Sequence, residues 1–155
     1  MNTAQLYNQA DLVGPLRVQF PAAGSPIIMN NRYCAATRAW VEQRFSNYFW
    51  NFEIARGQLT YKTRGNQCEH YALRAALEVV DLLRQMQDSQ IPEDAESLAV
   101  ACCKFLKGAG TDAAAWHEVN LWFFEGAWFP WEPQLRAFFE FTEAERLSVQ
   151  QVLIP

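Results

Sequence analysis

The sequence has no dense cluster of basic residues and no long apolar run. Its 13 Lys and Arg residues are outnumbered by 17 Asp and Glu residues, which gives a formal net charge of -4 at pH 7. Binding to a phosphate backbone depends on clustered Lys and Arg, so nucleic acid is not an expected partner. Asp11 and Arg17 interrupt the apolar residues of the first 24 positions, which argues against a signal peptide or a membrane span. We therefore expect a soluble, cytoplasmic protein with no membrane partner; export by a non-classical route and the oligomeric state stay open.

Cysteine and histidine are scarce, which limits metal and disulfide chemistry. The chain has four cysteines and two histidines, and no cysteines are spaced as CxxC. Without a secretory signal, the cysteines are expected to be free thiols, and no metal site is expected. Cys34, Cys102 and Cys103 are expected to be small core residues, because cysteine is commonly buried and inert. This leaves Cys68 as the candidate reactive thiol.

Length and composition predict one domain spanning residues 1–155. Half of the residues are hydrophobic, enough for one substantial core, and no internal repeat is present. Gly and Pro are concentrated in the first thirty residues, at Gly14-Pro15, Pro21 and Gly24 to Pro26. These clusters predict that residues 1–30 form an irregular N-terminal arm.

Three segments have the apolar periodicity or the end signals of helices. Aromatic and aliphatic residues recur at helical spacing over residues 31–52, and again from a point close to Cys68 to Leu83. Pro92, the acidic residues that follow it and the later lysines predict a third helix that ends at Gly108. Cys68 is therefore expected near a helix N-terminus.

The last third of the chain has the composition of strands. Residues 116–124 and 127–132 are rich in Trp, Phe and Val, and Glu125-Gly126 between them predicts a two-residue hairpin turn. Residues 135–141 are a candidate further strand, and Thr142 with Glu145 has the form of a capping box that opens a short helix. The whole pattern predicts an α+β fold, with N-terminal helices packed on an antiparallel sheet.

The hairpin makes a prediction about side-chain geometry. A two-residue turn at 125–126 places Val119 opposite Glu132 and His117 opposite Gln134. Since side chains alternate between the faces of a strand, these four residues share one face. His117 and Glu132 are then diagonal neighbours about 7–8 Å apart at the backbone, a gap that their side chains can bridge. A shift of one residue in this register would place Glu132 on the other face.

These residues together supply what thiol catalysis requires. Such catalysis needs a thiolate nucleophile, a base that exchanges protons with it, and a group that orients the base. We predict Cys68 as nucleophile, His117 as base and Glu132 as orienting acid. The helix start, with a nearby imidazolium, is expected to lower the pKa of Cys68 and to provide backbone N–H groups for an oxyanion. Candidate further donors to the oxyanion or the substrate are Gln67, Gln134 and Asn120.

The order and the flanking residues of these positions resemble a known superfamily. A cysteine that opens a helix, a histidine on a following strand and a carboxylate on the next strand form the layout of papain-like and transglutaminase-like enzymes. Residues 68–72 (CEHYA), 117–120 (HEVN) and 131–134 (WEPQ) resemble more closely the C-terminal peptidase domain of fungal chimeric (agglutinin) lectins and its stand-alone bacterial and phage relatives. Members of that family read approximately CDDFA, HAVN and EPQ. The resemblance covers roughly residues 67–134 and implies a cysteine peptidase that acts on a protein or peptide substrate.

The resemblance also raises the question of calcium. Fungal members are calcium-dependent, but His70 stands here at the second acid of the family's cysteine motif, and histidine is a poor calcium ligand. The remaining candidate ligands are Glu69, Asp112, Glu118 and Asn120. The resemblance thus implies calcium binding, and His70 weakens that expectation for this chain. His70 itself is expected at the surface. No other cofactor is expected.

Three functional hypotheses follow from the sequence. The first is a peptide hydrolase that works through a thioester on Cys68. The second is a transglutaminase or deamidase that uses the same three residues on glutamine amides. The third is a catalytically idle interaction or structural module, associated with a phage or a toxin, that keeps the fold.

Overall fold

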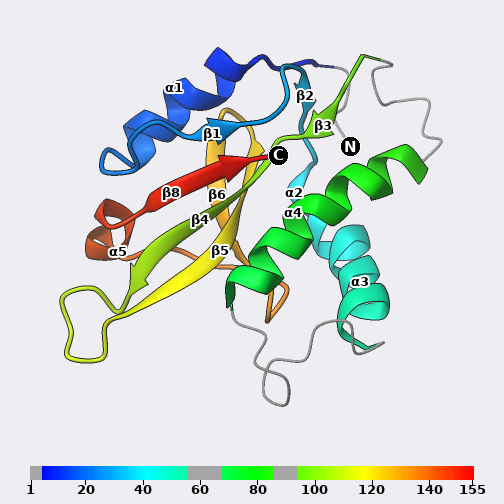
Figure 1. The fold of residues 1–155 in the computed structure, drawn as a ribbon. Helices are drawn as coiled ribbons and strands as arrows, with labels where there is room; N and C mark the ends of the chain where they lie inside the picture. Colours follow the sequence, from blue (N-terminus) through cyan, green and yellow to red (C-terminus); the bar gives the residue numbers. More distant parts are fainter. Residues whose placement is uncertain (1–4, 56–67, 86–93) are drawn as a thin grey trace.

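The computed structural model describes residues 5–55, 68–85 and 94–155, with the backbone alone for residues 80–85. Helices and strands are mixed, which confirms the predicted α+β class (Figure 1). Pro92, Glu93 and Gln67 lie outside the described residues. Among the described residues, no helix combines the length and the apolar composition that a membrane crossing requires.

A six-stranded sheet in the order β1-β8-β4-β5-β6-β7 organises the described part of the chain. Its strands are β1 (Ile27–Ile28), β4 (Val100–Lys107), β5 (Ala115–Phe124), β6 (Ala127–Glu132), β7 (Ala137–Phe138) and β8 (Gln150–Ile154). All neighbouring pairs are antiparallel except β1 and β8. A separate parallel pair joins β2 (Tyr33–Cys34) to β3 (Ser97–Leu98).

The helices cover the two faces of the sheet (Figure 1). The helices are α1 (Gln9–Gln19), α4 (Cys68–Gln85), the short α5 (Glu143–Leu147), and a continuous segment built from α2 (Arg38–Trp40), η1 (Val41–Phe45), α3 (Ser46–Phe49) and η2 (Trp50–Ile54). The segment 38–54 and α4 pack with Val100, Trp122 and Trp131 in one core. Helix α1 packs with Val119, Leu121 and other residues of the opposite face in a second core. The even-numbered residues of β5 thus face α4, and the odd-numbered residues face α1.

The predicted hairpin is present with the predicted register. Phe124 pairs with Ala127, and the ladder continues to Asn120 and Trp131. Glu125 and Gly126 have φ values of 55° and 76°, the left-handed conformations that a type I′ turn requires. The even loop therefore keeps His117 and Glu132 on one face, as the sequence predicted.

Two predictions about the fold are wrong. The described part of the predicted third helix forms strands β3 and β4 instead, and β4 lies at the centre of the sheet, buried on both faces over its first half. Its apolar residues are continuous, so a strand of this kind lacks the alternation that identifies strands. The arm at residues 1–30 is not wholly irregular either. It contains β1 and α1, whose capping box joins Asn8 to Asp11 and whose interior accommodates Pro15.

The other predicted elements are confirmed with changed bounds. The helix predicted over 31–52 begins only at Arg38, because the preceding residues form β2. The strand predicted over 135–141 is reduced to β7. Within the described residues helix α4 spans Cys68–Gln85, and the predicted capping box between Thr142 and Glu145 opens α5.

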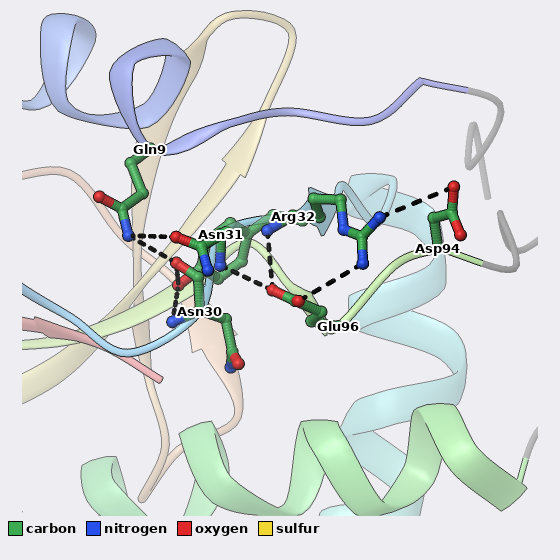
Figure 2. A network of polar contacts seen from close by, with 7 residues as sticks. Gln9, Asn30, Asn31, Arg32, Asp94 and Glu96 are labelled. Carbon is green, nitrogen blue, oxygen red and sulfur yellow. Dashed lines mark hydrogen bonds and ion pairs between the residues drawn. The ribbon is translucent and has the colours of Figure 1, made fainter.

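A polar network ties the N-terminal region to the segment before β3 (Figure 2). One carboxylate oxygen of Glu96 accepts the backbone N–H groups of Asn31 and Arg32 at 2.7 and 3.0 Å. The Arg32 guanidinium lies 3.6 Å from Glu96 and 3.8 Å from Asp94. The Gln9 amide donates to the Asn30 carbonyl at 2.8 Å, which attaches α1 to the same network.

Candidate active site

Cys68 is held beside the sheet by the packing of α4. One face of the helix is buried and includes Tyr71, Ala72 and Ala75. Leu73 and the other residues of the opposite face are exposed. Alanines on the buried face allow the helix backbone to lie close to the strands. Asn120, fully buried on β5, donates from its amide to the Ala72 carbonyl at 2.8 Å. This bond fixes α4 to β5 one helical turn after Cys68.

His117 and Glu132 meet as the hairpin register predicts. The His117 Nε2 atom lies 2.5 Å from Glu132 Oε2. The other carboxylate oxygen accepts the backbone N–H of Gln134 at 3.1 Å. Because both oxygens of Glu132 are engaged, its carboxylate has one orientation. The proton on His117 is thereby directed to Nε2, which leaves Nδ1 as the nitrogen available to a thiol.

The Cys68 sulfur lies next to His117 along the edge of β5. It accepts the backbone N–H of Glu118 at 3.3 Å, one peptide unit from His117. A strand N–H points in the plane of the sheet, and those of β5 alternate between its two neighbours. Phe123 donates toward β4, so Glu118 points toward β6. Since β6 ends at Glu132, the sulfur occupies the place that a further β6 residue would take.

The thiol and the imidazole are not hydrogen-bonded to each other in this arrangement. Among the described residues, Cys68 bonds the Glu118 N–H and also donates its S–H to the Glu69 carboxylate, at 3.5 Å. The His117 ring is turned instead to Glu132, with an edge contact to the Phe105 ring at 5.8 Å between centroids. A rotation of the Cys68 side chain is therefore needed to bring sulfur and Nδ1 together.

The electrostatic surroundings of Cys68 differ from the sequence expectation. A lowered pKa was predicted, but the pKa of Cys68 is raised above its ordinary value. Burial is the largest cause; the Glu118 N–H opposes it, and the carboxylates of Glu69 and Glu118 raise the pKa further. The pKa of Glu118 is itself raised, first by burial and then by Glu69. The resting structure thus favours the neutral thiol, because two acids and no bonded imidazolium surround it.

The other three cysteines are buried, as predicted. Cys34, Cys102 and Cys103 are free thiols inside the protein. Burial raises the pKa of Cys34 and of Cys102 to about 11. They differ from Cys68, which is partly exposed, so a solvent-borne thiol reagent distinguishes them.

The candidate donors occupy different kinds of position. Gln67 lies outside the described residues. Gln134 contributes its backbone N–H to Glu132, and its side-chain Nε2 is buried without a partner among the described residues. Asn120 bonds the Ala72 and Ala101 carbonyls, and its Oδ1 lacks a partner within the described part of the chain. The structure therefore gives Asn120 a tethering position under α4, away from solvent. A polar residue inside the apolar run of β5 was the sequence signal for this role.

The residues described do not form a metal centre. No group of three or more His, Cys, Asp or Glu side chains within residues 5–55, 68–85 and 94–155 is arranged to hold an ion. Of the candidate calcium ligands, Asn120 is buried in its backbone bonds, whereas Asp112 is exposed in the β4–β5 loop. Glu69 and Glu118 interact with each other, but these two acids alone do not supply the several oxygens that calcium takes. His70 is exposed, as predicted.

A pocket opens beside the His117–Glu132 pair. It has a volume of about 300 Å³ and an apolar wall to which Phe105, Leu135 and Phe139 contribute. His117 and Glu132 line the same pocket. The residues of this wall come from β4, the β6–β7 turn and the segment after β7, and no sequence pattern predicted that they would lie together.

Comparison with known proteins concerns the fold. No protein-family model matches the chain, and no curated protein matches it by sequence. A solved structure described as "PSL1a-E64 complex" is similar, with a TM-score of 0.64 and 12% sequence identity. The match covers 96% of this chain and 51% of that chain, so the chain spans about half of its length. At this level of identity, the similarity extends to the fold alone.

Proposed function

We propose that the protein is a cysteine peptidase with a papain-like fold, in which Cys68 is the nucleophile, His117 the base and Glu132 the acid that orients it. The observation that carries the proposal is the His117–Glu132 pair, at 2.5 Å, with the Cys68 sulfur bonded one peptide unit from His117. The similar fold of a protein in complex with E64, a cysteine protease inhibitor, supports it.

The proposed reaction is acyl transfer through a thioester. With Cys68 turned toward Nδ1, His117 takes the thiol proton and the sulfur attacks the amide carbonyl. The C–N bond breaks as the imidazolium gives its proton to the leaving amine. A water molecule, deprotonated by His117, then cleaves the thioester, which releases the acid and restores the thiol. Glu132 holds the proton of His117 on Nε2 throughout.

Covalent labelling tests the nucleophile directly. The wild-type protein, Cys68→Ala and His117→Ala are incubated with E64, and the intact mass is measured. We expect one adduct on the wild type, none on Cys68→Ala, and much slower labelling of His117→Ala. Cys34, Cys102 and Cys103 serve as internal controls because they are buried. Hydrolysis of a pool of peptide aminomethylcoumarins by the wild type, lost in Cys68→Ala, completes the test. An unlabelled wild-type Cys68 would refute the proposal.

The second candidate is a catalytically idle module with the same fold. It is favoured by the surroundings of the Cys68 thiol. The thiol is bonded to the Glu69 carboxylate and the Glu118 N–H and not to His117, and the pKa of Cys68 is raised. Iodoacetamide alkylation measured against pH separates the two candidates. A peptidase reacts at Cys68 well below pH 8, because the imidazolium stabilises the thiolate in the turned conformation. An idle thiol reacts only above its ordinary pKa.

A further inference from the structure

The pocket beside His117 lies on the face of the sheet opposite α4. His117 pairs with Phe105 across β4 and β5, and both face the core that contains α1. Cys68, by contrast, is the first residue of α4 and reaches the sheet in its plane, at the edge of β5. Cys68 is not among the residues that line the pocket. His117 is the residue common to both: its ring lines the pocket, and its neighbour in the chain contacts the thiol.

This placement selects one half of a substrate. In the proposed reaction, the leaving nitrogen must come within hydrogen-bond distance of the His117 ring to receive its proton. The substituent on that nitrogen therefore starts at the imidazole, where the pocket opens. The acyl half is attached to the sulfur and lies on the thiol side. The pocket is thus placed to receive the side chain next to the leaving amine.

The lining of the pocket indicates the chemistry of that side chain. Its wall is predominantly apolar, with Phe105, Leu135 and Phe139 among its large apolar residues. Lys107 and Glu145 bring charges of opposite sign, and the remaining carboxylate of the lining, Glu132, is already bonded to His117 and to the Gln134 N–H. A volume of about 300 Å³ is at the lower end for ligand pockets and suits one large side chain.

We propose that this pocket is a specificity site that binds an aromatic or branched aliphatic side chain on the amine half of the substrate. The inference rests on the proposed function for the identity of the ligand. It predicts that amide bonds are cleaved before Phe, Leu or similar residues in preference to bonds before Gly or Asp.

An experiment with added amines, which compete with water for the acyl-enzyme, tests the pocket independently of the leaving group. The enzyme is acylated by a pool of N-acyl amino acid p-nitrophenyl esters, whose departing phenol leaves the pocket empty. Amino acid amides are then offered; the acceptor's amine attacks the thioester, the C–S bond breaks, and a peptide amide and the free thiol result. We expect phenylalaninamide and leucinamide to give at least tenfold more aminolysis relative to hydrolysis than glycinamide at equal concentration, because they bury apolar area in the pocket. Equal ratios with normal hydrolysis would overturn the inference and leave the proposed function intact.

A variant with a matched control locates the effect. Leu135 is 72% exposed, so Leu135→Asp changes the pocket wall with little effect on folding. We expect it to reduce the preference for phenylalaninamide, measured as the ratio of aminolysis to hydrolysis, to the level of glycinamide. Val18→Asp, at a residue of α1 that is 80% exposed, should leave the preference unchanged. Retention of the preference in Leu135→Asp would overturn the assignment of the pocket.

A binding measurement separates this inference from the proposed function. Because the chain has two histidines, the imidazole ¹⁵N signals of Cys68→Ala can be assigned with a His70→Gln variant. Phenylalaninamide is expected to shift the His117 signals in a saturable manner and to leave His70 unchanged. If phenylalaninamide binds saturably and Leu135→Asp abolishes this binding, the assignment of the pocket stands even if the protein hydrolyses no substrate. The lack of hydrolysis would then refute only the proposed function. Unchanged His117 signals would overturn the pocket.

Discussion

Replacement of Glu132 by Gln changes one atom in the bonding of His117. Both carboxylate oxygens of Glu132 act as acceptors, one for His117 and one for the Gln134 N–H. A glutamine at this position has a single acceptor oxygen. If that oxygen stays on Gln134, the amide NH₂ faces Nε2 of His117, which must then give up its proton to Nδ1. That tautomer cannot take the thiol proton.

The expected magnitude follows from the bond that is lost. A hydrogen bond to a charged group contributes about 1.5–3 kcal/mol. At about 1.4 kcal/mol for each tenfold change in rate, Glu132→Gln should lower kcat/KM by about 10- to 150-fold. The fold should persist, since glutamine has nearly the same shape as glutamate.

Two measurements check this prediction. The first is kcat/KM on the aminomethylcoumarin pool, with the exposed Glu140→Gln as a control that keeps full activity. The second is the imidazole ¹⁵N spectrum, in which the proton of His117 should be on Nε2 in the wild type and on Nδ1 in Glu132→Gln. A variant that folds normally and keeps activity within threefold of the wild type would show that Glu132 does not orient the base.

Three further predictions concern helix α4 and the groups that contact it. Asn120→Ala removes the amide tether under α4 and should lower the free energy of unfolding in urea by about 1–3 kcal/mol, with faster amide hydrogen exchange in the first turns of the helix. Glu69→Gln removes the negative charge beside the thiol; the thiolate of Cys68 then forms more readily, so the midpoint of iodoacetamide alkylation should shift to lower pH. Arg74→Met leaves the buried carboxylate of Glu53 without its ion partner at 2.9 Å and should cost about 2–3 kcal/mol in urea unfolding.

Each of these predictions has a control and a contradicting result. For the tether, exposed Asn47 provides an Asn→Ala control, and an Asn120→Ala protein with unchanged exchange in α4 would contradict the assignment. For the thiol, exposed Glu42→Gln should leave the alkylation midpoint in place, and an unshifted Glu69→Gln would show that the acid does not act on the sulfur. For the ion pair, exposed Arg44→Met should be nearly neutral, and an Arg74→Met protein as stable in urea as the wild type would contradict the prediction.

The sequence predicted the hairpin better than any other part of the fold because local chemistry determines it. Glu125-Gly126 suits one turn type, and that turn fixes every pair along β5 and β6. The contact between His117 and Glu132 follows from this register. Strand β4 was mistaken for a helix for the opposite reason. One of its two neighbours, β8, comes from a distant part of the chain, and burial on both faces removes the alternation that marks a strand.

The arrangement around Cys68 could be predicted only in part. The position of Cys68 on a helix follows from local periodicity. The contacts of its sulfur with Glu118 and Glu69 depend on where α4 crosses the edge of β5 and on how far β6 extends. These contacts depend on the tertiary structure. For that reason the sequence predicted a lowered pKa for Cys68, whereas burial and two carboxylates raise it.

The distance between the proposed nucleophile and the proposed base depends on residues that line neither the thiol nor the pocket. Alanines at 72, 75 and 76 form the underside of α4, and each added methylene there would lift the helix from the strands. Such a substitution would move the sulfur away from the imidazole while every reactive group stayed chemically unchanged. In the proposed peptidase, loss of activity can therefore begin in the interior of the protein, where side-chain volume matters as much as the chemistry of the reacting groups.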